Sequence, residues 1–121
     1  MTDNKRFLRA YFEASRHMMA LSTSMELPVS IMVTFLGAAL WEAEEPMVSL
    51  EELAARTGQP PSTISGHLRY LGTRYRLGKP GLGLVYTVPD SENLRKKNFG
   101  LTPRGRALAA QLEAIFEKAA S

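Results

Sequence analysis

The side chains with the clearest chemical use in this sequence are its arginines and lysines, and most of them lie in one region. Residues 60 to 106 contain nine basic and two acidic residues, whereas residues 1 to 59 contain five basic and eight acidic ones. The overall net charge of +3 therefore hides a strongly basic segment. Such a segment is typical of surfaces that bind phosphate groups, nucleic acids above all. A basic surface that only contacts water is the alternative.

Residues suited to catalysis or metal binding are few. The sequence has no cysteine, which excludes disulfides and thiolate metal sites. His17 and His67 lie in different predicted helices, without carboxylates at the spacing of a catalytic triad or a metal site, and are interpreted as structural. Glu42, Glu44 and Glu45 stand at a predicted helix end and are interpreted as solvated. The sequence thus predicts no enzyme, no metal site and no cofactor.

The segment 49 to 71 overlaps the start of the basic region. Its pattern is that of two short helices joined by a turn. Ser49 and Glu52 have the spacing of a capping box, which begins a helix. Gly58 stands where a left-handed residue ends that helix, and Pro61 suits the first turn of the next one. Apolar residues recur at helical spacing in both halves, namely Leu50, Leu53 and Ala54, then Ile64, Leu68 and Leu71. This pattern predicts a helix-turn-helix, with an ordinary helical hairpin in a core as the alternative.

The second of these helices leaves one face without large apolar side chains. The residues on that face are Pro61, Ser62, Ser65, Gly66 and Arg69. In a DNA-binding helix-turn-helix this face enters the major groove, so these five residues are the predicted groove contacts. Arg69 is the only long hydrogen-bonding side chain among them, and base recognition is therefore expected to rest on few contacts.

The remaining elements are predicted more coarsely. Residues 4 to 21 and 103 to 120 are expected to be amphipathic helices, and residues 28 to 44 a helix that is apolar on most sides. Residues 72 to 83 contain four glycines and are predicted as a flexible basic loop. Residues 84 to 101 are predicted as a β-hairpin, because two β-rich stretches flank a turn-like segment.

The order of helix, helix, helix-turn-helix, hairpin and helix is that of a winged-helix domain. Over nearly its whole length the sequence resembles the MarR-type (multiple-antibiotic-resistance regulator) transcription factors. The matching motifs are Glu52-Leu53-Ala54 with Gly58, Ser62-Thr63-Ile64-Ser65, and LTPRGRALAAQLE at 101 to 113. Arg95 matches the wing arginine of that family, and Asn93 stands where an aspartate is usual. The loop at 72 to 83 is longer than in the family.

The predicted fold class is mostly α with a small β-hairpin wing, a winged helix-turn-helix forming a single domain over residues 1 to 121. The resemblance implies a transcriptional regulator that binds double-stranded DNA as a homodimer, at a pseudo-palindromic site. The basic residues expected to contact DNA after the recognition helix are Arg74, Arg76, Arg95, Lys96 and Lys97. A winged-helix protein-interaction module without sequence-specific DNA binding is the alternative.

The two terminal helices are the expected dimerisation elements. Their predicted interface residues are Phe7, Tyr11, Met18, Leu112, Ile115 and Phe116. A small aromatic effector is a further expected partner, with Tyr11, Phe35, Trp41 and Tyr70 as candidate lining, although a plain apolar core explains these aromatics too. No stretch is long and uncharged enough to cross a bilayer, so no membrane partner and a cytoplasmic location are expected.

Overall fold

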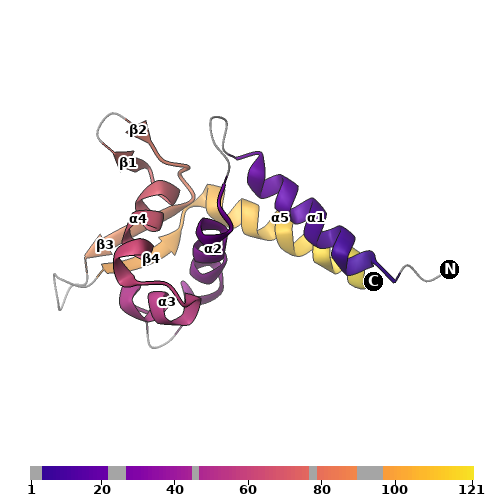
Figure 1. The fold of residues 1–121 in the computed structure, drawn as a ribbon, viewed down its shortest axis with the longest axis horizontal. Helices are drawn as coiled ribbons and strands as arrows, with labels where there is room; N and C mark the ends of the chain where they lie inside the picture. The colour runs from indigo at the N-terminus through magenta and orange to yellow at the C-terminus, as the bar shows by residue number, and fades with distance from the viewer. Residues whose placement is uncertain (1–3, 22–26, 45–46, 77–78, 90–96) are drawn as a thin grey trace.

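The computed structural model of the 121-residue chain describes residues 4 to 21, 27 to 44, 47 to 76, 79 to 89 and 97 to 121 (Figure 1). Its elements, in order, are α1 (Arg6–Met19), α2 (Val29–Trp41), α3 (Leu50–Thr57), α4 (Pro61–Leu71), β1 (Arg74–Arg76), β2 (Lys79–Pro80), β3 (Val85–Pro89), β4 (Lys97–Leu101) and α5 (Pro103–Ala120). Within the described residues, no helix combines the length and the apolar character needed to span a membrane.

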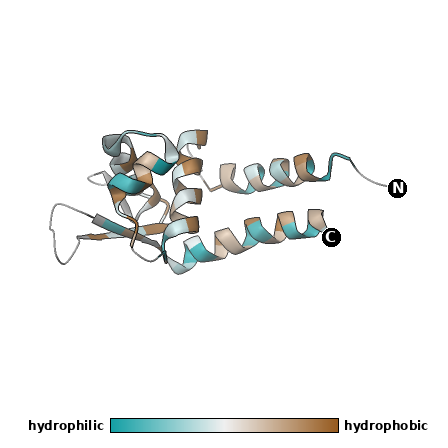
Figure 2. Ribbon diagram, turned by 90° about the horizontal axis from the view of Figure 1, so that it is seen from below, coloured by the Kyte–Doolittle hydropathy of each residue, from teal (hydrophilic) through white to brown (hydrophobic). Residues whose placement is uncertain are grey.

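The molecule has two parts, a body and an arm. The body contains α2, α3, α4 and both hairpins, and the arm consists of α1 and α5, which pack along each other and project away from the body (Figures 1 and 2). The two helices are antiparallel, since the N-terminus of α1 and the C-terminus of α5 lie together at the outer end of the arm (Figure 1). The body therefore carries the helix-turn-helix, and the arm contains the first and the last described helices.

The core of the body lies where α2, α3 and α4 meet the first residues of the wing. Phe35, Leu53, Ile64, Leu71 and Val85 are each at most 1% exposed. Burying an aliphatic or aromatic side chain of this size contributes about 1.5 to 3 kcal/mol. The apolar face predicted for the helix-turn-helix is thus the face that the protein buries.

The helix-turn-helix has the predicted caps. The Ser49 hydroxyl accepts a hydrogen bond from the Glu52 amide at 3.2 Å, which satisfies one of the free amides at the start of α3. Gly58 ends α3 with a φ of +72°, in the left-handed region that glycine enters without steric cost. Pro61 is the first residue of α4. Local sequence signals therefore fix both the end of α3 and the start of α4.

The segment 72 to 83, predicted as a flexible loop, instead contains a short hairpin. β1 pairs antiparallel with β2, and the returning chain continues this pairing at its base. The Leu82 amide donates to the Tyr70 carbonyl at 2.9 Å, and the Leu84 amide donates to the Leu71 carbonyl at 2.7 Å. Backbone pairing of this kind is hidden from a composition-based prediction, because it does not need β-branched side chains.

The wing and the last helix form as predicted. β3 and β4 are antiparallel, with Val85 opposite Leu101 and Pro89 opposite Lys97. The Thr102 hydroxyl accepts from the Gly105 amide at 3.1 Å and donates to the Gly83 carbonyl at 2.7 Å. One side chain thus caps α5 and fastens it to the segment that leads into the wing.

Glu42, at the end of α2, corrects an interpretation made from sequence, whereas Glu44 is exposed as expected. Glu42 is not solvated, because a carboxylate oxygen of its side chain accepts from the Leu101 amide at 3.0 Å and pairs with Arg106 at 3.2 Å. Glu42 therefore joins α2 to β4 and α5. Glu44 pairs with Arg56 on α3. Glu45 lies outside the described residues.

Candidate nucleic-acid interface

The predicted groove-contacting face of α4 is accessible. Pro61, Ser62 and Arg69 are exposed, and Ser65 and Gly66 are half-buried. The opposite side of the helix is filled by Ile64, Leu68 and Leu71, which are at most 2% exposed. The five predicted residues therefore lie on the side of α4 that faces away from the core. Their side chains are small except for Arg69.

Gly66 stands in the middle of α4 with open space around it. A Cβ atom built at this position has no heavy atom within 4 Å. Packing inside this chain therefore does not require glycine here, although glycine inside a helix costs about 0.5 to 1 kcal/mol relative to alanine. Because glycine has no side chain, nothing projects from α4 at the centre of its exposed face, and a partner can approach the helix backbone closely there.

His67, the next residue, fastens α4 to α2. Its Nδ1 lies 2.8 Å from the hydroxyl of Thr34, which is fully buried. That hydroxyl donates its single hydrogen to the Ser30 carbonyl at 3.1 Å and accepts from Gln59 Nε2 at 3.1 Å. It can then accept a further hydrogen bond from Nδ1–H of His67. His67 is thus structural, as predicted, and it positions α4 through a buried polar contact.

Partial burial also makes His67 sensitive to pH. Burial lowers the pKa of His67 below its ordinary value of about 6.5, because leaving water disfavours the charged imidazolium. Folding therefore favours the neutral form. This contribution to stability is complete above about pH 6.5 and is lost as the pH falls through the lowered pKa of the folded protein.

We expect the free energy of unfolding to fall more steeply from pH 7 to pH 5 in the wild type than in His67→Gln, whose amide does not titrate. Urea denaturation at each pH measures this difference. The matched control is His17→Gln, which removes an imidazole from the exposed surface of α1 and should keep the wild-type profile. Parallel profiles for the wild type and His67→Gln would contradict the prediction.

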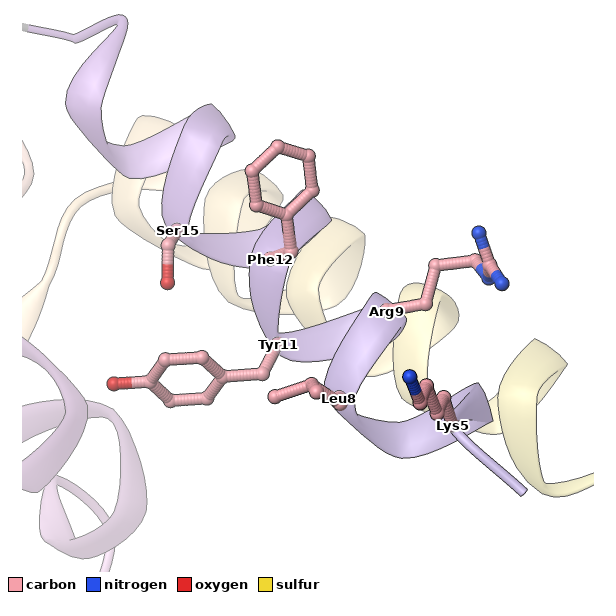
Figure 3. A pocket seen from close by; sticks show the side chains of 6 residues that line it. All are labelled: Lys5, Leu8, Arg9, Tyr11, Phe12 and Ser15. Atoms are coloured by element: carbon pink, nitrogen blue, oxygen red, sulfur yellow. The ribbon is translucent and has the colours of Figure 1, made fainter. Parts of the chain in front are cut away.

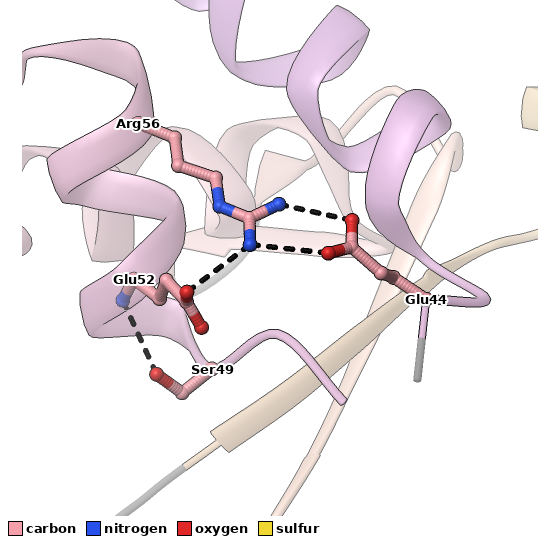
Figure 4. A network of polar contacts seen from close by, with 4 residues as sticks. All are labelled: Glu44, Ser49, Glu52 and Arg56. Atoms are coloured by element: carbon pink, nitrogen blue, oxygen red, sulfur yellow. Dashed lines mark hydrogen bonds and ion pairs between the residues drawn. The ribbon is translucent and has the colours of Figure 1, made fainter. Parts of the chain in front are cut away.

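A second polar cluster holds α3 against α2 (Figure 4). The two terminal nitrogens of Arg56 donate to the two carboxylate oxygens of Glu44 at 3.0 and 3.2 Å, and one of them also pairs with Glu52 at 3.1 Å. The guanidinium lies 4.9 Å from the ring centre of Trp41. The hydrogen bond from Arg56 lowers the pKa of Glu44 below its ordinary value. The Glu52–Arg56 spacing was visible in the sequence, whereas the contact to Glu44 was not.

Both hairpins pack against α4. α4 contacts β1 on one side and β3 on another, and in Figure 1 it lies between the two hairpins. The backbones of Arg74 and Arg76 form β1, and Lys97 begins β4. Arg95 and Lys96, the other predicted wing contacts, lie outside the described residues. The backbones of the two hairpins therefore flank α4.

Helix α1 of the arm buries its alanines and exposes most of its large apolar side chains. The buried residues of α1 are Ala10, Ala14 and Met18, the face that α5 covers. The exposed ones include Phe7 at 50%, Leu8 at 67%, Tyr11 at 59%, Phe12 at 60% and Met19 at 58%. A helix that buries its alanines and exposes its aromatics leaves most of its apolar surface in contact with water, where burial by a partner is favourable.

Two of the six predicted dimer-interface residues are placed differently from the prediction. Met18 is 3% exposed and Leu112 is 7% exposed, and both belong to the apolar core of this chain. They are unavailable to a partner because α1 and α5 cover them. Ile115 is partly buried and Phe116 is 37% exposed. With Phe7 and Tyr11, these two remain candidates for an interface.

Three of the four aromatics predicted to line an effector pocket belong to the apolar core of the body, as the alternative interpretation expects. Phe35 is buried in the core cluster, and Trp41 and Tyr70 pack against the same cluster. Tyr11 instead lines a hollow of about 480 Å³ beside α1, together with Lys5, Leu8, Arg9, Phe12 and Ser15 (Figure 3). The described residues contain no group of three or more histidine, aspartate or glutamate side chains placed to hold a metal ion.

Solved structures with the same arrangement include MepR, in a complex with DNA, and MarR. S. aureus MepR in a DNA complex superimposes with a TM-score of 0.64 over 94% of this chain and 79% of its own, at 17% identity. MarR itself gives a TM-score of 0.60 over 93% of this chain and 71% of its own, at 22% identity. The chain has the MarR-type winged-helix fold. The predicted fold class is therefore confirmed.

A third structure with this MarR-type fold is Bordetella bronchiseptica BpsR, whose title describes regulation of its DNA binding by 6-hydroxynicotinic acid. It gives a TM-score of 0.56 over 94% of this chain and 77% of its own, at 21% identity. No protein-family model matches the sequence, and a search of curated proteins gives no significant match. The likeness is thus one of fold, carried by structure more than by sequence.

Proposed function

We propose that this protein is a DNA-binding transcriptional regulator that acts as a homodimer and reads a pseudo-palindromic duplex site. The observation that carries the proposal is the exposed face of α4, with small side chains, a glycine in open space and a single long cation, Arg69. A helix face with such small side chains can lie close to the base edges in the major groove. The MarR-type fold supports the assignment, since MepR is described in complex with DNA.

Specific and general contacts are divided among the elements of the body. Arg69 would donate to a guanine edge, while Ser62 and Ser65 would contact bases or phosphates. The wing residues Arg95, Lys96 and Lys97 would contact phosphates or the adjacent minor groove. Because most of these groups are cationic, binding should weaken strongly as salt concentration rises.

The second copy of the chain is the proposed occupant of the exposed apolar face of α1, with Ile115 and Phe116 of α5 at its edge. Pairing two arms across a two-fold axis would bury the aromatic side chains that α5 leaves uncovered. It would also place two α4 helices roughly 34 Å apart, one turn of DNA, which is the reason for expecting a pseudo-palindromic site.

A small aromatic effector remains part of the proposal in a revised place. The hollow beside α1 has Leu8, Tyr11 and Phe12 for apolar contact with an aromatic ring. Because Tyr11 and Phe12 also belong to the proposed dimer surface, a ligand bound there would alter how the two arms pair and so the relation between the two α4 helices. BpsR, which has the same fold, is described as responding to an aromatic acid.

The test compares two substitutions with the same side chain. Gly66→Leu should keep or raise the free energy of unfolding, because the site is open and leucine favours a helix by about 0.5 to 1 kcal/mol over glycine. It should nevertheless weaken DNA binding by tenfold or more, since leucine holds α4 away from the groove. The control Ala55→Leu, at an exposed position of α3, should change neither quantity by much.

The duplex for this experiment comes from selection among random sequences with the wild-type protein. Arg69→Ala should then cost about 1 to 3 kcal/mol on the selected site and less on random DNA. If the wild type and Gly66→Leu bind DNA with equal affinity, the proposal that α4 enters the major groove is wrong. If the wild type binds no duplex, the chain is instead a winged-helix protein-interaction module.

A further inference from the structure

The hairpin formed by β1 and β2 has no role in the function proposed so far. It follows α4 directly and forms a sheet of its own, separate from the β3–β4 wing. α4 packs against β1 and also against β3, and it lies between the two hairpins in Figure 1. The recognition helix is therefore flanked on two sides by short β-ribbons, of which one is the wing.

This hairpin is built onto the end of α4. The Gly81 amide donates to the Thr73 carbonyl at 3.1 Å, and the Gly83 amide donates to the Gly72 carbonyl at 2.9 Å. The two chain segments approach so closely that a Cβ atom at position 81 would fall on the carbonyl oxygen of Gly72. Glycine at 81 is thus required for the contact, and the base of the hairpin is held in a defined position relative to α4.

All charged residues of the hairpin segment are basic. The segment 72 to 84 contains Arg74, Arg76 and Lys79 and no acidic residue. The backbones of all three belong to β1 or β2. A ribbon with three positive charges and no negative charge favours an anionic partner. Because the ribbon lies beside α4, which is proposed to bind DNA, we expect that partner to be the same DNA.

We propose that the β1–β2 hairpin is a second phosphate-binding ribbon, which contacts the DNA backbone on the side of the major groove opposite to the wing. The inference rests on the proposed function, that α4 enters the groove. The major groove is about 12 Å wide and bounded by one phosphate backbone on each side. A helix in that groove, with a basic ribbon on either side of it, contacts both backbones.

The ribbon adds affinity and fixes the orientation of α4, but it carries no sequence information of its own. Its effect should therefore be equal on the selected site and on random duplexes. This separates it from Arg69, whose replacement is expected to have a larger effect on the selected site.

The experiment uses the full chain with Arg74→Gln, Arg76→Gln and Lys79→Gln combined. We expect lower affinity for every duplex and a shallower salt dependence, by a slope of about 0.9 for each phosphate that the variant no longer neutralises. The matched control combines Arg6→Gln, Arg16→Gln and Lys118→Gln, which removes the same charge from exposed positions on the arm. That control should keep the wild-type slope, with its oligomeric state checked by sedimentation.

Hydroxyl-radical footprinting locates the phosphates that the hairpin binds. The hairpin variant should lose protection at phosphates on one side of the groove, whereas replacing Arg95, Lys96 and Lys97 by glutamine should lose it on the other. An unchanged slope and footprint in the hairpin variant, while the wild type binds DNA, would overturn this inference and leave the proposed function intact. Absence of DNA binding by the wild type would overturn the proposed function itself.

Discussion

Replacing Tyr11 and Phe12 together with aspartate should give a monomer whose affinity for a duplex with two half-sites is lower by about 10²- to 10⁴-fold. Linking two binding units raises the overall affinity by about 10²- to 10⁴-fold without any new contact, and a monomer loses this gain in affinity. Both side chains are about 60% exposed in the single chain, so the aspartates should leave its fold intact. In a dimer they would place unpaired charges in an apolar interface.

Sedimentation velocity measures the oligomeric state, and titration of duplexes with one and two half-sites measures binding. The variant should bind a single half-site about as well as one protomer of the wild type does. Met47→Asp is the control, because Met47 is 58% exposed but lies in the body, before α3. A variant that remains a dimer would place the interface elsewhere, and a wild type that is monomeric at micromolar concentration would exclude the two-half-site mechanism.

The parts of the fold that sequence predicted are those fixed by neighbours in the chain. Ser49 caps α3 through an amide three residues away, and Gly58 ends that helix through its own backbone conformation. Thr102 caps α5 in the same local way. Because each signal acts within one turn of helix, it can be recognised without knowing where the rest of the chain lies.

The parts that sequence missed depend on residues far apart. Glu42 was interpreted as solvated because its partners, the Leu101 amide and Arg106, come about 60 residues later. The same distance problem applies to Met18, which was assigned to a dimer surface. Helical spacing identifies an apolar stripe on α1, but it cannot tell which side α5 covers. The small residues Ala10 and Ala14 decided that, since they allow the two helices to pack closely.

The sequence predicted which residues α4 exposes, but it did not predict the contacts that hold α4 in place. The five residues on the free face of α4 follow from helical periodicity alone, which also buries Ile64 and Leu68 on the other side. The contact between His67 and Thr34 joins residues 33 positions apart, and a lone histidine gives no sign of its partner. The β1–β2 hairpin was missed because its strands are short and lie in a glycine-rich segment.

Gly105→Ala should destabilise the protein by more than the 1 to 3 kcal/mol or so of an ordinary overpacked site. Gly105 lies in the first turn of α5, and a Cβ atom there would fall on the Leu84 carbonyl oxygen. That oxygen belongs to the backbone and accepts from the Thr102 amide at 3.0 Å, so it cannot rotate away. The methyl group would therefore separate α5 from the wing and break the cap that joins them.

The control is the same substitution in α4. Gly66→Ala, in open space, should raise the free energy of unfolding by about 0.5 to 1 kcal/mol, because alanine favours a helix over glycine. Urea denaturation measures both variants, and helix propensity alone would move their midpoints upward together. Opposite shifts would show that position 105 requires glycine for close contact between α5 and the wing, whereas position 66 does not require it for folding. A Gly105→Ala midpoint at or above the wild-type value would contradict the close approach of α5 to Leu84.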